Sequence, residues 1–286
     1  MTLGFFLPSL LQLISRVQDE KAAAHRLDAA YAPLESATEF CGYGLPRAGD
    51  DCRARFGLPG VAPFNWAGPI TTGDLDVGTT RRSGGLCRIV YAVPSGVRCA
   101  EETVSPTGRF AVRLTENPHL LDQASGTPNL IKNWAIFGAM QPSHYPLWLE
   151  SKSTGAGGNH ATLRGQSASV DLTIPRNDEI FYLRALELRV RRVASGSDVD
   201  YILYANDYTG SGVQPRVEGI VDMRFELTGE KLLRVSILAR GNTKYNTIAT
   251  SGTPPGWPEA YAADIPAEMR YFKLFAKQRS FELMNL

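Results

Sequence analysis

The chain of 286 residues carries 30 Lys and Arg against 29 Asp and Glu, which gives a formal net charge of +1 at pH 7. A balance this even provides no overall field that would draw the protein to nucleic acid or to an acidic membrane surface. The 27 glycines and 18 prolines indicate many turns without reaching the composition of a disordered chain. The length suffices for one large all-β domain or two small ones. No apolar run approaches the ~18 residues that a membrane-spanning helix needs.

Residues 1–35 predict an N-terminal helical arm. Ser9 can cap the helix after Pro8, and we expect the helix to end before Pro33, because proline removes a helix hydrogen bond. The arm lacks the basic start of a signal peptide, so we do not expect secretion. Its apolar residues recur at helical spacing and form one stripe: Leu10, Leu13, Ile14, Val17, Ala24, Leu27 and Tyr31. The stripe packs either on the body of its own chain or on a neighbouring subunit, and the pattern leaves both open.

Residues 36–165 predict a loop-rich β region. We expect residues 36–84 to be irregular, because Gly, Pro and Asp occur throughout them and no hydrophobic periodicity extends beyond a few residues. The stretch 151–165 is rich in Gly and Ser and predicts a flexible loop. Strand patterns occupy three segments, of which the last could also be a short helix: Leu86–Val93, Gly108–Leu114 and Asn129–Gly138.

All four cysteines lie in this region, at Cys41, Cys52, Cys87 and Cys99. Two local disulfides are possible, but a chain without a secretory signal favours four reduced, buried thiols. A zinc site is not expected, because no Cys-x-x-Cys pair is present.

Residues 166–250 predict the main antiparallel β block, which forms one sandwich with the preceding region. One register of the hairpin around Gly229 places every large apolar side chain on one face and the charged ones on the other. It pairs Leu227 with Leu233, Phe225 with Val235, Met223 with Ile237, and Glu226 with Arg234.

Two further strands complete this block. In residues 180–193 the apolar positions change parity near Ala185, which predicts a β-bulge or bend there. Residues 199–205 are apolar on both faces, which predicts a strand buried on both sides.

Residues 251–286 predict an extended C-terminal tail after the proline-rich segment 254–258. Its end is either a last strand or a helix that begins at Pro266. Both chain ends carry more apolar surface than solvated termini need, which is typical of interaction surfaces. The candidate partner contacts are Leu10, Leu13, Val17, Tyr271, Phe272 and Phe275.

Motifs of catalysis, metal binding and cofactor binding are missing, so we predict no enzymatic activity, no metal and no cofactor. A cluster of basic residues at Arg184, Arg189, Arg191 and Arg192 could meet phosphate or carboxylate groups. The alternative is a solvated outer face paired with Glu187 and Asp198. Aromatic side chains in loop-like contexts could line a sugar-binding platform or be buried: Trp134, Trp148, Trp257, Tyr145 and Tyr261.

Together these patterns predict a mainly β chain, an antiparallel β-sandwich of possibly jelly-roll type with an N-terminal helical arm and long irregular loops. The predicted function is that of a non-enzymatic structural protein in a symmetric assembly, a virus capsid or phage virion component. Its partners would be other copies of itself or other subunits, with no specific nucleic acid and no membrane. The expected location is the virion, or alternatively a cytoplasmic assembly. A carbohydrate-binding β-sandwich is the alternative function, and a hydrolase with a site invisible in the sequence is the third.

Overall fold

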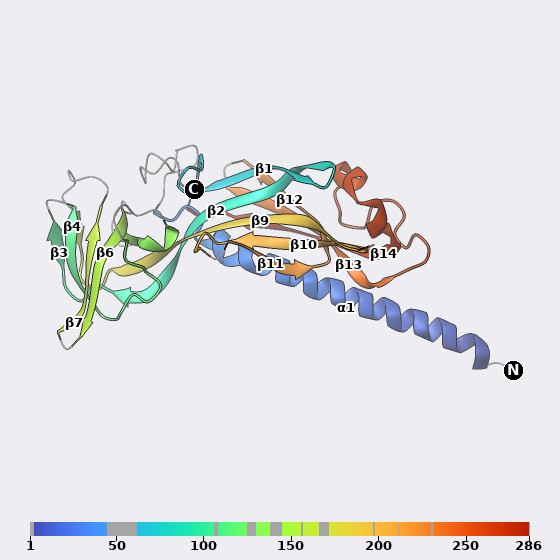
Figure 1. The fold of residues 1–286 in the computed structure, drawn as a ribbon, viewed down its shortest axis with the longest axis horizontal. Coiled ribbons are helices and arrows are strands. Elements are labelled where there is room, and N and C mark those ends of the chain that lie inside the picture. Colours follow the sequence, from blue (N-terminus) through green and yellow to red (C-terminus); the bar gives the residue numbers. More distant parts are fainter. Residues whose placement is uncertain are drawn as a thin grey trace.

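The computed structural model describes residues 3–44, 62–105, 108–124, 130–137, 145–155, 157–165, 172–196, 198–210, 212–229 and 231–285. The chain is mainly β, with antiparallel sheets and a long N-terminal helix (Figure 1), which confirms the predicted fold class.

The large sheet has nine strands. Seven follow the order β1-β2-β9-β5-β6-β7-β4, while β10 pairs with β9 and β11 with β10. Their bounds are β1 Ile70–Val77, β2 Thr80–Arg98, β4 Arg109–Leu114, β5 Trp134–Phe137, β6 Tyr145–Gly155, β7 Gly158–Arg164, β9 Glu179–Ser195, β10 Asp198–Asn206 and β11 Val213–Glu218.

A second sheet has the order β12-β13-β14, and β3 pairs with β8 in a small ladder. These strands are β12 Ile220–Thr228, β13 Leu232–Lys244, β14 Phe272–Glu282, β3 Thr103–Ser105 and β8 Leu172–Ile174. Short 3-10 helices occupy Ile131–Asn133, Glu259–Asp264 and Ala267–Tyr271. The C-terminal residues therefore form a last strand, which the sequence could not distinguish from a helix.

Helix α1 runs from Leu3 to Glu39, so the prediction that it ends before Pro33 is wrong. Beyond the proline, Leu34 and Ala37 lie on the same buried side as Tyr31. Burial of these side chains, worth roughly 1.5–3 kcal/mol for each large one, offsets the ~3 kcal/mol that an interior proline costs a helix.

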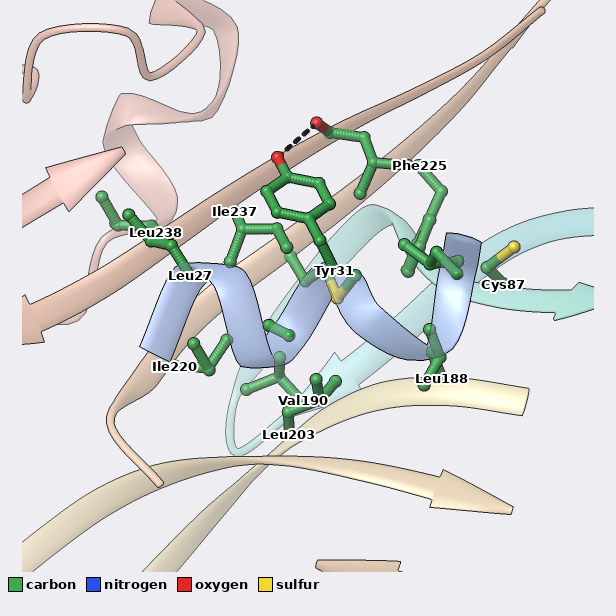
Figure 2. Close-up of a cluster of buried hydrophobic side chains, with 14 of the residues drawn as sticks. Leu27, Tyr31, Cys87, Leu188, Val190, Leu203, Ile220, Phe225, Ile237 and Leu238 are labelled. Carbon is green, nitrogen blue, oxygen red and sulfur yellow. Dashed lines mark hydrogen bonds between the residues drawn. The ribbon is translucent and has the colours of Figure 1, made fainter. Parts of the chain in front are cut away.

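The largest core lies between the two sheets and α1 (Figure 2). Tyr31 points from the helix toward β13, and its hydroxyl lies 3.0 Å from the carbonyl oxygen of Val235. Ile237 lies on that side, while Val190 and Leu203 of the large sheet lie on the other. Part of the helix is therefore an integral layer of the sandwich.

The hairpin of β12 and β13 has the predicted register. Phe225 lies opposite Val235 in the core, while Glu226 lies opposite Arg234 with both side chains solvent-exposed. The observed pairs confirm the predicted register. This register places the large apolar side chains on one face and the charged side chains on the other.

We expect Phe225→Ala to lower the free energy of unfolding by about 3–5 kcal/mol, because it leaves a cavity at a buried aromatic position. Glu226→Ala, on the adjacent residue, should cost less than ~1 kcal/mol, as for an exposed ion pair. Urea denaturation of both variants measures the difference, and equal costs would contradict the burial pattern.

Of the bulge or bend predicted near Ala185 in β9, the bulge is absent, because β9 pairs with β2 without a register shift there. Leu183 and Ala185 pack into a core on one face, while Leu186 and Leu188 pack into the main core on the other. The apolar residues change parity because the strand supports different cores along its length.

Three other predictions also need correction. Strand β10 is buried on one face only, because Ile202 and Tyr204 remain partly exposed. Residues 36–84 contain the end of α1, strand β1 and the start of β2. The stretch 151–165 is largely the hairpin of β6 and β7, whose mostly polar, exposed side chains hide the period-2 pattern.

The thiols of Cys87 and Cys99 are buried, and neither forms a disulfide. Burial raises the pKa of Cys99 to about 12, and burial also raises the pKa of Cys87. Cys41 is buried as well, while Cys52 lies outside the described residues.

We therefore expect the native protein to react slowly with a thiol reagent at pH 8, where buried thiols with raised pKa values stay protonated. Under denaturing, non-reducing conditions the same reagent should titrate four thiols. A count of two or zero would contradict the prediction of reduced cysteines.

Candidate subunit interface on the N-terminal helix

Helix α1 divides into a buried part and a projecting part. From Ala23 onward one face of the helix is buried in the main core, whereas Ala24 of the predicted stripe is exposed. The buried face consists of Ala23, Leu27, Ala30, Tyr31, Leu34 and Ala37. The preceding turns extend past the sheets, and the N-terminus lies at the far end of the molecule (Figure 1). Along these turns five large apolar side chains are exposed: Leu10 54%, Leu11 59%, Leu13 57%, Ile14 45% and Val17 40%. We call residues 10–17 the projecting segment.

The exposed apolar side chains do not continue the buried stripe of the helix. At 100° per residue, their mean direction is rotated by roughly a third of a turn from that of Ala23, Leu27 and Leu34. The side chains of these turns that face the body are polar, namely Ser15 and Asp19. The angle between the two apolar directions can be obtained from a helical projection of the sequence. The prediction of a single apolar stripe over residues 10–31 did not include it.

Asp19 fixes the direction in which the helix leaves the body. Its buried carboxylate accepts hydrogen bonds from the backbone N–H groups of Asn242 at 2.8 Å and Thr243 at 2.9 Å, and from the hydroxyl of Tyr245 at 3.0 Å. A Cβ at Gly241 would lie only 2.7 Å from the Asp19 carboxyl carbon, so a glycine is required there. Charge-assisted bonds of this kind are strong, and they attach the base of the segment to the end of β13.

A groove opens where the segment leaves the body. It has a volume of about 290 Å³ and is lined by Arg16 and Glu20 of α1, by Lys273, Leu274 and Phe275 of β14, and by Ala249, Thr250, Ser251, Thr253, Pro254 and Pro255. Arg16 and Glu20 form an exposed ion pair of 3.0 Å on its helical side. Apolar and polar surface therefore alternate at the base of the projecting segment.

The predicted contact residues near the C-terminus, unlike those of the projecting segment, are mostly packed against their own chain. Strand β14 is part of the protein's own second sheet, so Phe272 is buried and Phe275 packs against the main core. Only Tyr271, at 38% exposure, remains open to solvent in the way expected of a contact residue. The tail is therefore not a free arm.

The four predicted basic residues do not form one patch. Arg184 and Arg192 share one face of β9, while Arg189 and Arg191 share the other. Burial lowers the pKa of Arg184, whose guanidinium donates to the backbone carbonyl of Leu183 at 2.8 Å.

The partners of the other basic residues follow the predicted pairing only in part. Arg189 lies 3.6 Å from Glu187, as expected, and Arg192 lies 3.6 Å from Glu268. Asp198 instead pairs with Lys244 at 3.7 Å.

The aromatic residues proposed for sugar binding are mainly packing residues. Trp134 and Trp257 are 2% and 5% exposed, Trp148 is partly buried, and Tyr261 packs on Trp257 at 6.1 Å between ring centroids. The side chain of Tyr145 lies outside the described residues. These rings do not provide an open stacking platform.

Among the residues described, no group of three His, Cys, Asp or Glu side chains could hold a metal ion. His160 contacts the carbonyl oxygen of Gly157 at 3.0 Å. His144 lies outside the described ranges.

Comparisons with protein-family models, curated proteins and solved structures find no match for this chain. Within the described residues, no helix combines the length and apolar character needed to cross a bilayer.

Proposed function

We propose that this protein is a non-enzymatic structural subunit of a symmetric, virion-like assembly, in which the projecting segment of one copy packs on a neighbouring copy. The observation that supports the proposal is the projecting segment itself. It presents five exposed apolar side chains, and hydrogen bonds from β13 to Asp19 anchor its base. Contiguous exposed apolar surface of this kind marks interaction sites.

The composition of the segment favours an apolar protein surface as its partner. Residues 3–15 contain no charged side chain, so neither nucleic acid phosphates nor acidic headgroups have a cation to bind there. A helix that lies on a membrane surface normally carries several Lys or Arg on its polar face, whereas residues 3–22 of α1 have only Arg16 and Lys21, beside Asp19 and Glu20.

A second copy of the chain offers a surface of matching character. The groove at the base of the helix has apolar surface at Leu274 and Phe275, beside Lys273. Tyr271, two residues earlier in the chain, is exposed. We place the neighbour's projecting segment along this groove. Such a contact joins two different surfaces, and repetition of it produces rings or shells.

The size of the segment favours an assembly of many subunits over a simple dimer. The projecting segment and the helical turns before it, residues 3–17, together span about 22 Å at 1.5 Å per residue. One helix of this length covers less than the ~800 Å² per partner of a stable pairwise interface. Several such contacts, shared among neighbours, would stabilise the assembly together.

We expect Leu13→Glu to dissociate the assembly, because it places a charge in the proposed contact and removes a buried apolar group. The loss of about 1.5–3 kcal/mol per contact corresponds to roughly a 10- to 150-fold weaker association. Gln12→Glu is the matched control, since it adds the same charge in the same helical turn, on the side opposite the mean direction of the five exposed apolar side chains. Light scattering should give a multiple of 31.3 kDa for the parent and the control but not for Leu13→Glu. Identical masses for all three would overturn the proposal.

A further inference from the structure

A second cavity lies on the face of the large sheet opposite α1. It has a volume of about 330 Å³ and is lined by Ala62, Asn65, Trp66, Ala67, Thr71, Thr72, Gly73, Leu86, Arg88 and Tyr208. Volumes near 300 Å³ are at the lower end of the range for small-molecule sites. Arg88 is the one charged side chain in this lining.

The strand register builds the floor of the cavity from one row of residues. Thr71 on β1 lies opposite Arg88 on β2, Arg88 lies opposite Glu187 on β9, and Glu187 lies opposite Asn206 on β10. These four strands lie side by side in the large sheet (Figure 1). Because directly opposed residues share a face, the row brings a cation, its counter-ion and two neutral polar groups together.

Glu187 holds Arg88 in place without occupying its whole guanidinium group. The buried carboxylate accepts a hydrogen bond from Nε of Arg88 at 2.9 Å and another from the hydroxyl of Tyr208 at 2.8 Å. The terminal nitrogens of Arg88 make no hydrogen bond to any described residue, and its side chain is 38% exposed. A guanidinium bound in this way still presents a fork of two N–H groups, which matches a carboxylate or phosphate.

The charge around this row favours an anion. Glu187 lies between two arginines, since Nε of Arg189 is 3.6 Å from its other oxygen. One carboxylate therefore faces two guanidinium groups, which leaves an excess of one positive charge. Burial, followed by the hydrogen bond to Glu187, raises the pKa of Tyr208, so its phenol stays protonated and adds no negative charge.

The aromatic wall is held rigidly. The rings of Trp66 and Tyr208 meet edge to face at 5.4 Å, and the guanidinium carbon of Arg88 lies 5.7 Å from the Trp66 centroid. Tyr208 has φ of 56°, a left-handed backbone conformation that a non-glycine residue adopts at a cost. Residues held in such conformations cluster at ligand-binding sites.

We propose that this cavity binds a small organic anion, whose carboxylate or phosphate pairs with the free fork of Arg88 and whose hydroxyl groups contact Thr71 and Asn65. The site is independent of the projecting segment and of assembly. Its size admits a ligand as large as a single sugar acid or sugar phosphate.

The test uses three probes with one sugar scaffold: glucose 6-phosphate, glucuronate and glucose. Binding is followed by NMR through the indole N–H signal of Trp66. We expect saturable shifts with at least one of the two anions, and binding at least about 10-fold weaker for neutral glucose, as for the loss of one charge-assisted pair. The anion that binds more tightly distinguishes a phosphate ligand from a carboxylate ligand.

Arg88→Lys keeps the charge but removes the fork, and should weaken anion binding at least about 10-fold. Arg81→Lys on the same strand, an exposed arginine paired with Asp74 at 3.2 Å, should leave binding unchanged. If Arg88→Lys does not fold, Thr71→Val in the cavity floor should still weaken binding. The proposal is overturned if no probe shifts the signal, if glucose binds as well as the anions, or if the folded Arg88 or Thr71 variants bind normally.

Discussion

Asp222→Ala should lower the free energy of unfolding by about 3–5 kcal/mol, because it leaves buried positive charges without their counter-ion. The Asp222 carboxylate accepts hydrogen bonds from Arg82 at 2.9 Å and from Nη2 of Arg224 at 2.8 Å. The side chains of these three residues are at most 2% exposed. Arg224 also reaches Asp264 at 2.8 Å. The network thereby joins β2 of the large sheet to β12 of the second.

Urea denaturation checks this prediction, with Asp198→Ala as the matched control. Asp198 pairs with Lys244, but its side chain is 82% exposed, so its loss should cost less than ~1 kcal/mol. A cost below 1 kcal/mol for Asp222→Ala would show that the network does not hold the sheets together. A change in the slope of the unfolding free energy against urea concentration would indicate that the substitution also alters the surface exposed on unfolding.

Deletion of residues 1–32 should unfold the protein, because it removes Ala23, Leu27, Ala30 and Tyr31 from the main core. Removal of a buried Leu and a buried aromatic residue costs about 2–5 and 3–5 kcal/mol. The sum approaches the 5–15 kcal/mol that stabilises a typical domain. An arm that served assembly alone could be removed without this loss.

Deletion of residues 1–17 is the control, since it leaves Asp19 and the buried part of the helix in place. We expect this shorter chain to keep its far-ultraviolet circular dichroism and to unfold cooperatively. If the deletion of 1–32 gave the same cooperative transition, the helix would not belong to the core. If the deletion of 1–17 unfolded the chain, the projecting segment would have a structural role within its own subunit.

The sequence predicted features that depend on local alternation. The hairpin of β12 and β13 was predictable because a one-residue slip would expose Phe225 and Met223. The change of parity in β9 was equally visible, but its cause was not. One strand with several cores and one bulged strand produce the same sequence pattern, and only the packing partners separate them.

Features that depend on distant contacts could not be predicted. Asp19 interrupts an apolar region in the sequence, and its role follows from backbone groups of β13 more than 200 positions away. The row of Thr71, Arg88 and Glu187 likewise exists only after three separate strands pair. Tertiary burial also explains why the helix passes Pro33, since local propensity alone would end it there.

A photoreactive amino acid at position 13 tests the central claim most directly, because it reports what covers the projecting segment. At the concentration where the protein assembles, irradiation should give a product of about twice 31.3 kDa. Its cross-linked peptide should come from residues 249–275 of another copy, around the groove at the helix base. The same probe at Ser36, an exposed position on the part of the helix that packs on its own body, should give little of this product. Monomer alone at both positions would contradict the account.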